Sequence, residues 1–183
     1  YWALLTAPEH VGSVSSQMGT EVFLMNVGVF GLFILAYYNL IGASFNGVTM
    51  GIIFCMLATC NSGSHPGNVW PIMLGYVLAS FLASGLSRLA GGSFTFVINA
   101  QAIVVGLCYA NGLSPITSKY GWFWGMVAAM MHYLLVTSVP NLHGGFCLYN
   151  GGFTAAVICI ILVPELERFC KTKAERKALK AAK

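Results

Sequence analysis

Apolar residues along this chain form long uninterrupted stretches instead of marking one face of a repeating pattern. The stretches cover residues 22–41, 47–60, 69–86, 94–110, 121–139 and 147–163. A helix that spans a bilayer needs roughly 20 consecutive apolar residues. The pattern therefore predicts an all-α integral membrane protein with five to six hydrophobic segments.

The stretch 47–60 is too short to cross a bilayer as a plain helix. At about 1.5 Å per residue it gives about 21 Å of helix, against a hydrocarbon core of about 30 Å. We therefore expect one or two of the segments to be short, broken or re-entrant.

Charge is confined to the ends of the chain. The sequence is 57% hydrophobic and 8% charged, whereas soluble domains carry about 25% charged residues. Between residues 22 and 164 the only formal charges are Arg88 and Lys119, so a water-soluble fold is excluded.

The charge pattern also predicts the domain organisation. Most of the basic residues lie between 168 and 183, and basic residues beside a membrane helix mark its cytoplasmic end. We expect an interfacial or connecting segment (1–20), a transmembrane domain (21–163) and a basic cytoplasmic tail helix (164–183) that begins at Pro164. Because the chain starts at Tyr1, we also expect further membrane segments upstream.

Two Asn-Gly motifs lie inside apolar stretches. They read Phe45-Asn46-Gly47 and Tyr149-Asn150-Gly151, and each is followed by a threonine, Thr49 or Thr154. Asn-Gly is typical of a turn, and a turn at membrane depth must be buried in protein or line a wet cavity. The motifs predict two helix breaks that face one polar site. The two motifs either belong to a partial internal repeat or resemble each other by coincidence.

The polar residues of the apolar region are the candidate site. The candidate binding residues are Asn46, Thr49, Asn99, Gln101, Asn150 and Thr154, and Asn26 is a further polar residue of the same region. Asn99 and Gln101 are expected in the middle of a helix. A carboxamide offers two donors and an acceptor, which suits an uncharged polar solute such as an amide, urea or a small polyol. The alternative is that these residues bond to one another and to neighbouring helices.

Catalysis has little support in the sequence. The region between 22 and 164 holds no carboxylate, no His-x-x-x-His pair and no G-x-S-x-G element, so we expect no enzyme, cofactor or metal. His132 is expected to bond to a neighbouring helix, His65 and His143 to be solvated in loops, and the cysteines to pack as small apolar residues.

Two functions follow. The first is a transporter or channel for a small polar solute, and the alternative is a non-transporting structural subunit of a membrane complex. Expected partners are the lipid bilayer of a prokaryotic plasma membrane, the solute, and further copies of the chain or partner membrane subunits, but no nucleic acid.

Three elements carry a resemblance to a known family: Met25-Asn26-Val27-Gly28, Phe45-Asn46-Gly47, and Leu148 to Ala155. On these the chain resembles an uncharacterised family of prokaryotic polytopic membrane proteins, known only as a domain of unknown function. The likeness covers roughly residues 15–165 and implies a membrane location.

A weaker resemblance is to one half of a urea transporter. Phe45 to Gly51 is similar to the aromatic-Asn-Ala/Gly-x-x-x-Gly element of that family, and Phe94 to Asn99 to its Phe-Thr-x-x-Phe-Asn element. This chain has Val97-Ile98 where that family has Pro-Phe. The resemblance implies an oligomer with a pore in each protomer.

Overall fold

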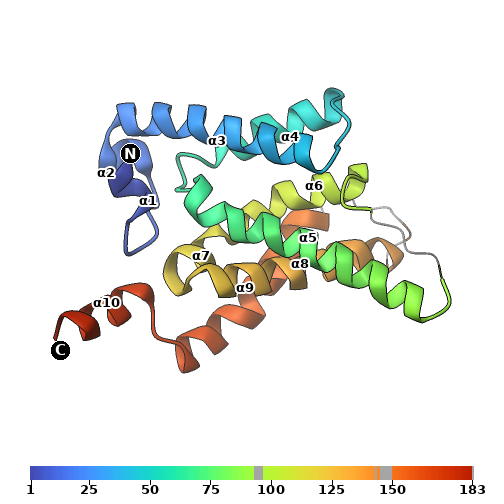
Figure 1. Ribbon diagram of the computed structural model, residues 1–183. Coiled ribbons are helices and arrows are strands. Elements are labelled where there is room, and N and C mark those ends of the chain that lie inside the picture. Colours follow the sequence, from blue (N-terminus) through green and yellow to red (C-terminus); the bar gives the residue numbers. More distant parts are fainter. Residues whose placement is uncertain (93–96, 143, 145–149, 183) are drawn as a thin grey trace.

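The computed structural model describes residues 1–92, 97–142, 144 and 150–182 (Figure 1). Regular structure in these residues is helical throughout, which confirms the predicted all-α class. The elements are α1 (Trp2–Leu5), α2 (Val14–Met18), α3 (Thr20–Leu40), α4 (Gly47–Ala58), α5 (Pro66–Leu89), α6 (Gln101–Ala110), the 3₁₀ turn η1 (Asn111–Leu113), α7 (Ser114–Tyr120), α8 (Trp122–Leu142), α9 (Asn150–Phe169) and α10 (Lys173–Ala181).

Three described helices are long and apolar enough to cross a bilayer: Thr20–Leu40, Pro66–Leu89 and Trp122–Val139. This is compatible with an integral membrane protein. Helices α4 and α6 have only 12 and 10 residues, which confirms the short segments. Helix α9 does not end at Pro164 as expected but continues to Phe169. Proline at this point removes one backbone donor without ending the helix.

The helices form a bundle with two distinct ends (Figure 1). Helices α4 and α6 run parallel, because Asn46 and Gln101 bond at their starts and Thr59 and Asn111 bond at their ends. At one end, here called the tail end, α5 and α8 begin, and both chain termini lie there. At the other end, called the site end, α4, α6 and α9 begin.

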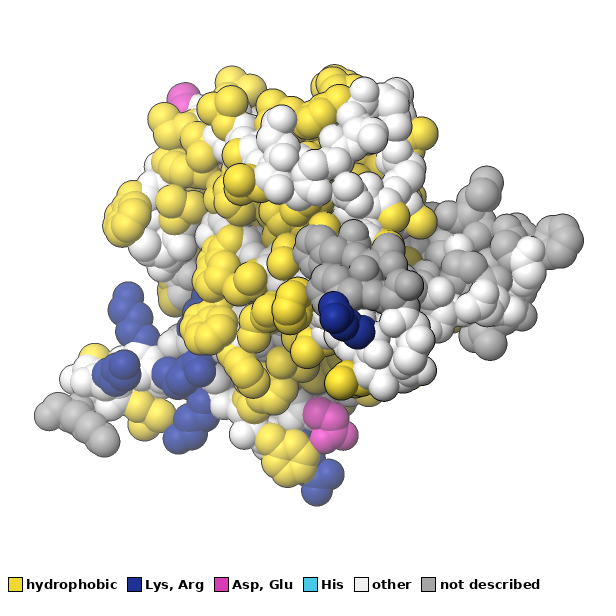
Figure 2. All heavy atoms as spheres, turned by 45° about the vertical axis from the view of Figure 1, so that its right-hand side comes forward, with side chains coloured by type: hydrophobic (Ala, Val, Ile, Leu, Met, Phe, Trp, Pro, Cys, Tyr) yellow, Lys and Arg dark blue, Asp and Glu magenta, His cyan; other side chains and the backbone are white. Residues whose placement is uncertain are grey.

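The closest pairing in the bundle is that of α5 with α8. Buried residues of these helices form the centre of the core, among them Ile72, Met73, Tyr76, Ala128 and Ala129. Outward-facing positions are apolar as well, as Figure 2 shows, and Leu32, Phe54 and Ile160 are 70%, 65% and 73% exposed. Apolar side chains on both the inside and the outside are expected of helices surrounded by lipid.

The connection from α4 to α5 is buried at the tail end, contrary to the expectation of a solvated loop. His65 is only 6% exposed, and Asn68 donates to the carbonyl of Gly63 at 2.8 Å and to Ser118 Oγ at 2.9 Å. The carbonyl oxygen of Val11 lies directly against Gly63, whose φ is +86°, so a side chain has no room there. The segment 1–18 thus covers this loop, and the predicted exposure of His65 is wrong. His143 lies outside the described residues.

A glycine sets the approach of α5 to α8. A Cβ on Gly75 would lie 2.7 Å from the carbonyl oxygen of Met126 and 2.8 Å from Ala129 Cβ, whereas Gly85 on the same helix has nothing within 4 Å. We expect Gly75→Ala to lower the free energy of unfolding by roughly 1–3 kcal/mol because the helices must separate. Gly85→Ala is the matched control and should be neutral or stabilising. Thermal unfolding in detergent measures both, and equal stabilities would contradict this packing.

His65 makes the stability of the tail end depend on pH. Its Nδ1 accepts from the backbone N–H of Gly67 at 3.1 Å and so caps α5. Burial, with Lys173 and His10 nearby, lowers the pKa of His65 to about 4. A lowered folded-state pKa means that the stabilisation is complete above the unfolded value of about 6.5. It is lost as the pH falls from there to about 4.

We therefore expect the stability of the protein to fall by about 3 kcal/mol between pH 6.5 and pH 4. The variant His65→Asn keeps a good capping acceptor but does not titrate, and should show a clearly shallower decrease. Unfolding measured in detergent as a function of pH tests this. The same slope in wild type and His65→Asn would contradict it.

Candidate functional site

The first Asn-Gly motif begins a helix instead of forming a turn. Asn46 has an extended backbone with φ of −134°, and its Oδ1 accepts from the backbone N–H of Thr49 at 3.0 Å. The hydroxyl of Thr49 donates to the carbonyl of Ser44 at 2.6 Å. Asn46 is thus the N-cap of α4, and the motif satisfies backbone groups that a helix start leaves unpaired.

Asn46 also joins α4 to α6. Its Nδ2 donates to Oε1 of Gln101 at 2.8 Å, and Nε2 of Gln101 donates to Thr49 Oγ1 at 3.4 Å. Asn46 is exposed, Gln101 half-buried and Thr49 buried. Three of the predicted site residues therefore meet where two short helices begin.

The start of α9 reaches the same place. A hollow of about 220 Å³ is lined by Gln101, Ala102, Val105, Gly106, Tyr109, Val136, Asn150 and Gly151. A Cβ on Gly151 would collide with the ring of Tyr109, so only glycine allows α9 to begin this close to α6. Gln101 thus connects the two Asn-Gly motifs, since it bonds to Asn46 and lines the hollow with Asn150.

The hollow is uncharged and mostly apolar, with the carboxamides of Gln101 and Asn150 as the polar side chains of its lining. Backbone N–H groups at helix starts lack partners within their own helix, and they carry the positive end of the helix dipole. Together with the carboxamide of Gln101 they can donate to or accept from a small polar molecule. The volume of the hollow exceeds by several times the space of about 30 Å³ that one water occupies.

Thr154 does not line this hollow. It is completely buried, and its hydroxyl lies 2.9 Å from the carbonyl of Gly151 and 3.0 Å from His132 Nε2. His132 also contacts the carbonyl of Gly151 at 2.9 Å, and its Nδ1 bonds to the hydroxyl of Tyr76. As predicted, His132 bonds to neighbouring helices, and through it α5 and α8 hold the first turn of α9.

Asn99 lies before α6, so its predicted position inside a helix is wrong. Gln101 is the first residue of that helix, also not in its middle. The Nδ2 of Asn99 donates to the carbonyl of Gly42 at 3.4 Å, which links the segments leading into α4 and α6. Asn26, the remaining polar candidate, is buried at the tail end and donates to the carbonyl of Ser64 at 2.8 Å.

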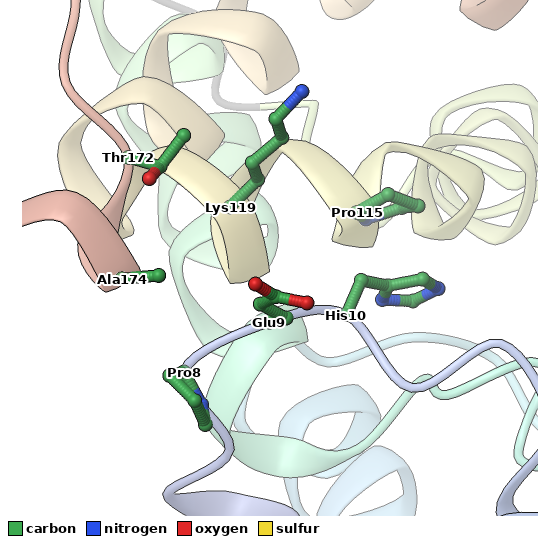
Figure 3. Close-up of a pocket in the computed structure, with 7 residues that line it drawn as sticks. All are labelled: Pro8, Glu9, His10, Pro115, Lys119, Thr172 and Ala174. Atoms are coloured by element: carbon green, nitrogen blue, oxygen red, sulfur yellow. The ribbon is translucent and has the colours of Figure 1, made fainter.

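A second hollow, of about 330 Å³, lies at the tail end and contains none of the predicted site residues (Figure 3). The segment before α2 contributes Pro8, Glu9 and His10 to it, and further lining comes from α7 and the tail. The amine of Lys119 on its edge pairs with Glu167 at 2.9 Å. Within the described ranges, no group of three His, Cys, Asp or Glu side chains could hold a metal.

A protein-family model matches residues 9–168, and its description reads "Protein of unknown function (DUF1576)". The chain belongs to this family. No curated protein and no solved structure matches the chain. Membership in DUF1576 agrees with the first resemblance inferred from the sequence and carries no activity with it, so the function must be argued from the site.

Replacement of His132 tests whether its hydrogen bonds hold the first turn of α9. In His132→Leu the buried hydroxyl of Tyr76 loses its partner, which costs roughly 1–3 kcal/mol, while the carbonyl of Gly151 keeps its bond from the hydroxyl of Thr154. The matched control is Ser138→Leu, because Ser138 is exposed on the same helix and bonds only to its own backbone at Leu134. Unfolding in detergent should show a large loss for His132→Leu alone. Equal losses would mean that the network does not hold α9.

Proposed function

We propose that this protein is a membrane transporter or channel for a small uncharged polar solute of the urea or amide type. The observation that carries the proposal is the meeting of Asn46, Gln101 and Asn150 where α4, α6 and α9 begin, beside a hollow of about 220 Å³. The solute would exchange hydrogen bonds with these carboxamides and helix starts, as substrates do at the broken helices of known transporter folds.

The lack of charged residues around the hollow supports a neutral solute over an ion. The residues that line the hollow include no Lys, Arg, Asp or Glu. Of the two formal charges between residues 22 and 164, Lys119 is paired with Glu167 at the tail end, and Arg88, in the last turn of α5 at the site end, does not line the hollow. An ion at this depth would lack a countercharge, which is costly in a medium of low dielectric constant.

The placement in the membrane is part of this proposal. Helices α3, α5 and α8 would span a prokaryotic plasma membrane, and the basic tail would lie in the cytoplasm because basic residues flank membrane helices on that side. The site end would then face the outside of the cell. Helix α4 covers only part of the bilayer, so its capped start lies where a solute can reach it.

A second candidate function is that of a structural subunit in a membrane complex. Its support is the surface of α3 and α4, where a Cβ on Gly28, Gly47 or Gly51 would meet nothing within 4 Å. Small residues on the outside of membrane helices allow a partner helix to approach closely. Further copies of this chain would fit there as well as a different subunit.

A double variant, Asn46→Leu with Asn150→Leu, separates the two functions. If the hollow is a solute site, the variant assembles normally, and the flux of urea or acetamide into proteoliposomes falls at least tenfold because the polar partners are lost. Flux is measured by stopped-flow light scattering. Asn39→Leu is the matched control, because Asn39 is exposed on α3 and bonds to its own backbone at Leu35.

Two outcomes contradict solute transport. One is a flux through wild-type proteoliposomes that equals that of empty liposomes for every neutral amide and polyol tried. The other is a double variant that keeps its flux but loses a co-purifying partner or its oligomeric state, which favours the structural subunit.

A further inference from the structure

Four basic side chains of α10 lie along one side of the helix. They are Lys173, Arg176, Lys177 and Lys180, at spacings of three and four residues, which places them on one face. The start of the helix is fixed, since Thr172 and Glu175 cap it reciprocally, with Glu175 Oε2 accepting from the N–H of Thr172 at 2.7 Å. We call these four residues the basic face.

The tail helix is attached to the bundle. A guanidinium nitrogen of Arg176 donates to the carbonyl of Tyr120 at 2.6 Å, and Lys173, half-buried, lies beside Gly121. Tyr120 is the last residue of α7, and a helix C-terminus favours a nearby cation. The basic face therefore has a fixed place at the tail end, and Figure 2 shows basic side chains gathered at the lower left of the apolar body.

Two tryptophans indicate the depth in the membrane at which α10 is attached to the bundle. Trp70 and Trp122 stack with ring centroids 6.2 Å apart, and they are 39% and 55% exposed. Tryptophan is enriched where membrane helices pass from hydrocarbon to headgroups. Because Trp122 follows Tyr120 by two residues, α10 begins at the level of the headgroups.

The basic face lacks acidic partners of its own. It lines, with Leu179, an open concave surface of about 600 Å³. The salt bridge present in the described part of the chain joins Lys119 to Glu167 and involves none of the four. Glu175 is engaged in the helix cap. Burial and the neighbouring Arg176 lower the pKa of Lys173.

We propose that the basic face binds the phosphate groups of anionic phospholipids in the leaflet at the tail end. The depth given by the tryptophans favours lipid over a nucleic acid, and so does Leu179, an apolar side chain that lies in the same concave surface as the basic face and is 48% exposed. Basic side chains near a membrane surface each add about 1 kcal/mol of attraction to anionic lipid. This inference requires insertion in a bilayer but does not depend on transport of a solute.

The full-length protein in a neutral detergent is titrated with phosphatidylglycerol or phosphatidylcholine, and bound lipids are counted by native mass spectrometry. We expect phosphatidylglycerol to bind at least tenfold more tightly, and the difference to shrink as salt is raised from about 0.1 M to 0.5 M. The triple variant Lys173→Gln, Lys177→Gln, Lys180→Gln should bind phosphatidylglycerol on the order of 100-fold more weakly.

Two variants control for folding and for total charge. Replacement of the same three lysines by arginine keeps the charge and should keep the affinity for phosphatidylglycerol. Arg88→Gln removes a cation far from the tail and should change nothing. Equal binding of both lipids by wild type, or unchanged binding by the glutamine variant, would overturn the proposal. Tighter binding of a single-stranded oligonucleotide than of phosphatidylglycerol to the basic face would also overturn it.

Discussion

The backbone groups exposed where helices begin inside an apolar bundle are the constraint on which this structure depends. Lipid cannot bond to such groups, so the protein must do so itself. Asn46 does this for α4 and His65 for α5, each through a side-chain atom that accepts from the first turn of its helix. Asn26 and Asn68 do the same for carbonyls of the buried connection between α4 and α5. Carboxamides thus permit short helices where hydrophobic packing alone would favour full spans.

The same residues connect helices to one another. The carboxamide of Asn46 accepts within α4 and donates to Gln101 of α6, and the carboxamide of Asn111 donates to Thr59 at the far ends of the same two helices. A single interhelical bond of this kind contributes only about 0.6 kcal/mol in a membrane protein. These bonds instead determine how α4 and α6 are placed along each other, because both bonds can form in only one register of the two helices. The hollow beside Gln101 follows from that register.

The apolar stretches and their lengths were sufficient to predict the long helices α3, α5 and α8 and the shortness of α4, because lipid imposes a length on every helix that crosses it. They did not predict that α6 begins only at Gln101. Residue type singled out Asn46, Gln101 and Asn150; the structure joins Asn46 to Gln101 by a hydrogen bond and places Gln101 and Asn150 in the lining of one hollow, while the first Asn-Gly motif is a helix cap and not a turn. The burial of His65 could not be predicted, since its loop has the composition of an exposed turn. It is covered by the segment that contains Val11, which is a contact between distant parts of the chain. The position of Thr154 beneath the hollow likewise depends on how α8 packs against α9.

The choice of asparagine as the capping residue follows from the same constraint. Aspartate is an equally good N-cap in water, yet the chain contains none. A carboxylate at Asn46 would accept from Thr49 but could not donate to Gln101, and it would bring a charge to the edge of the bilayer interior. The carboxamide supplies both bonds without that charge, whose transfer from water is expensive. Most charges of the protein are accordingly placed at the tail end, and Arg88, in the last turn of α5, is a charge at the site end that does not line the hollow.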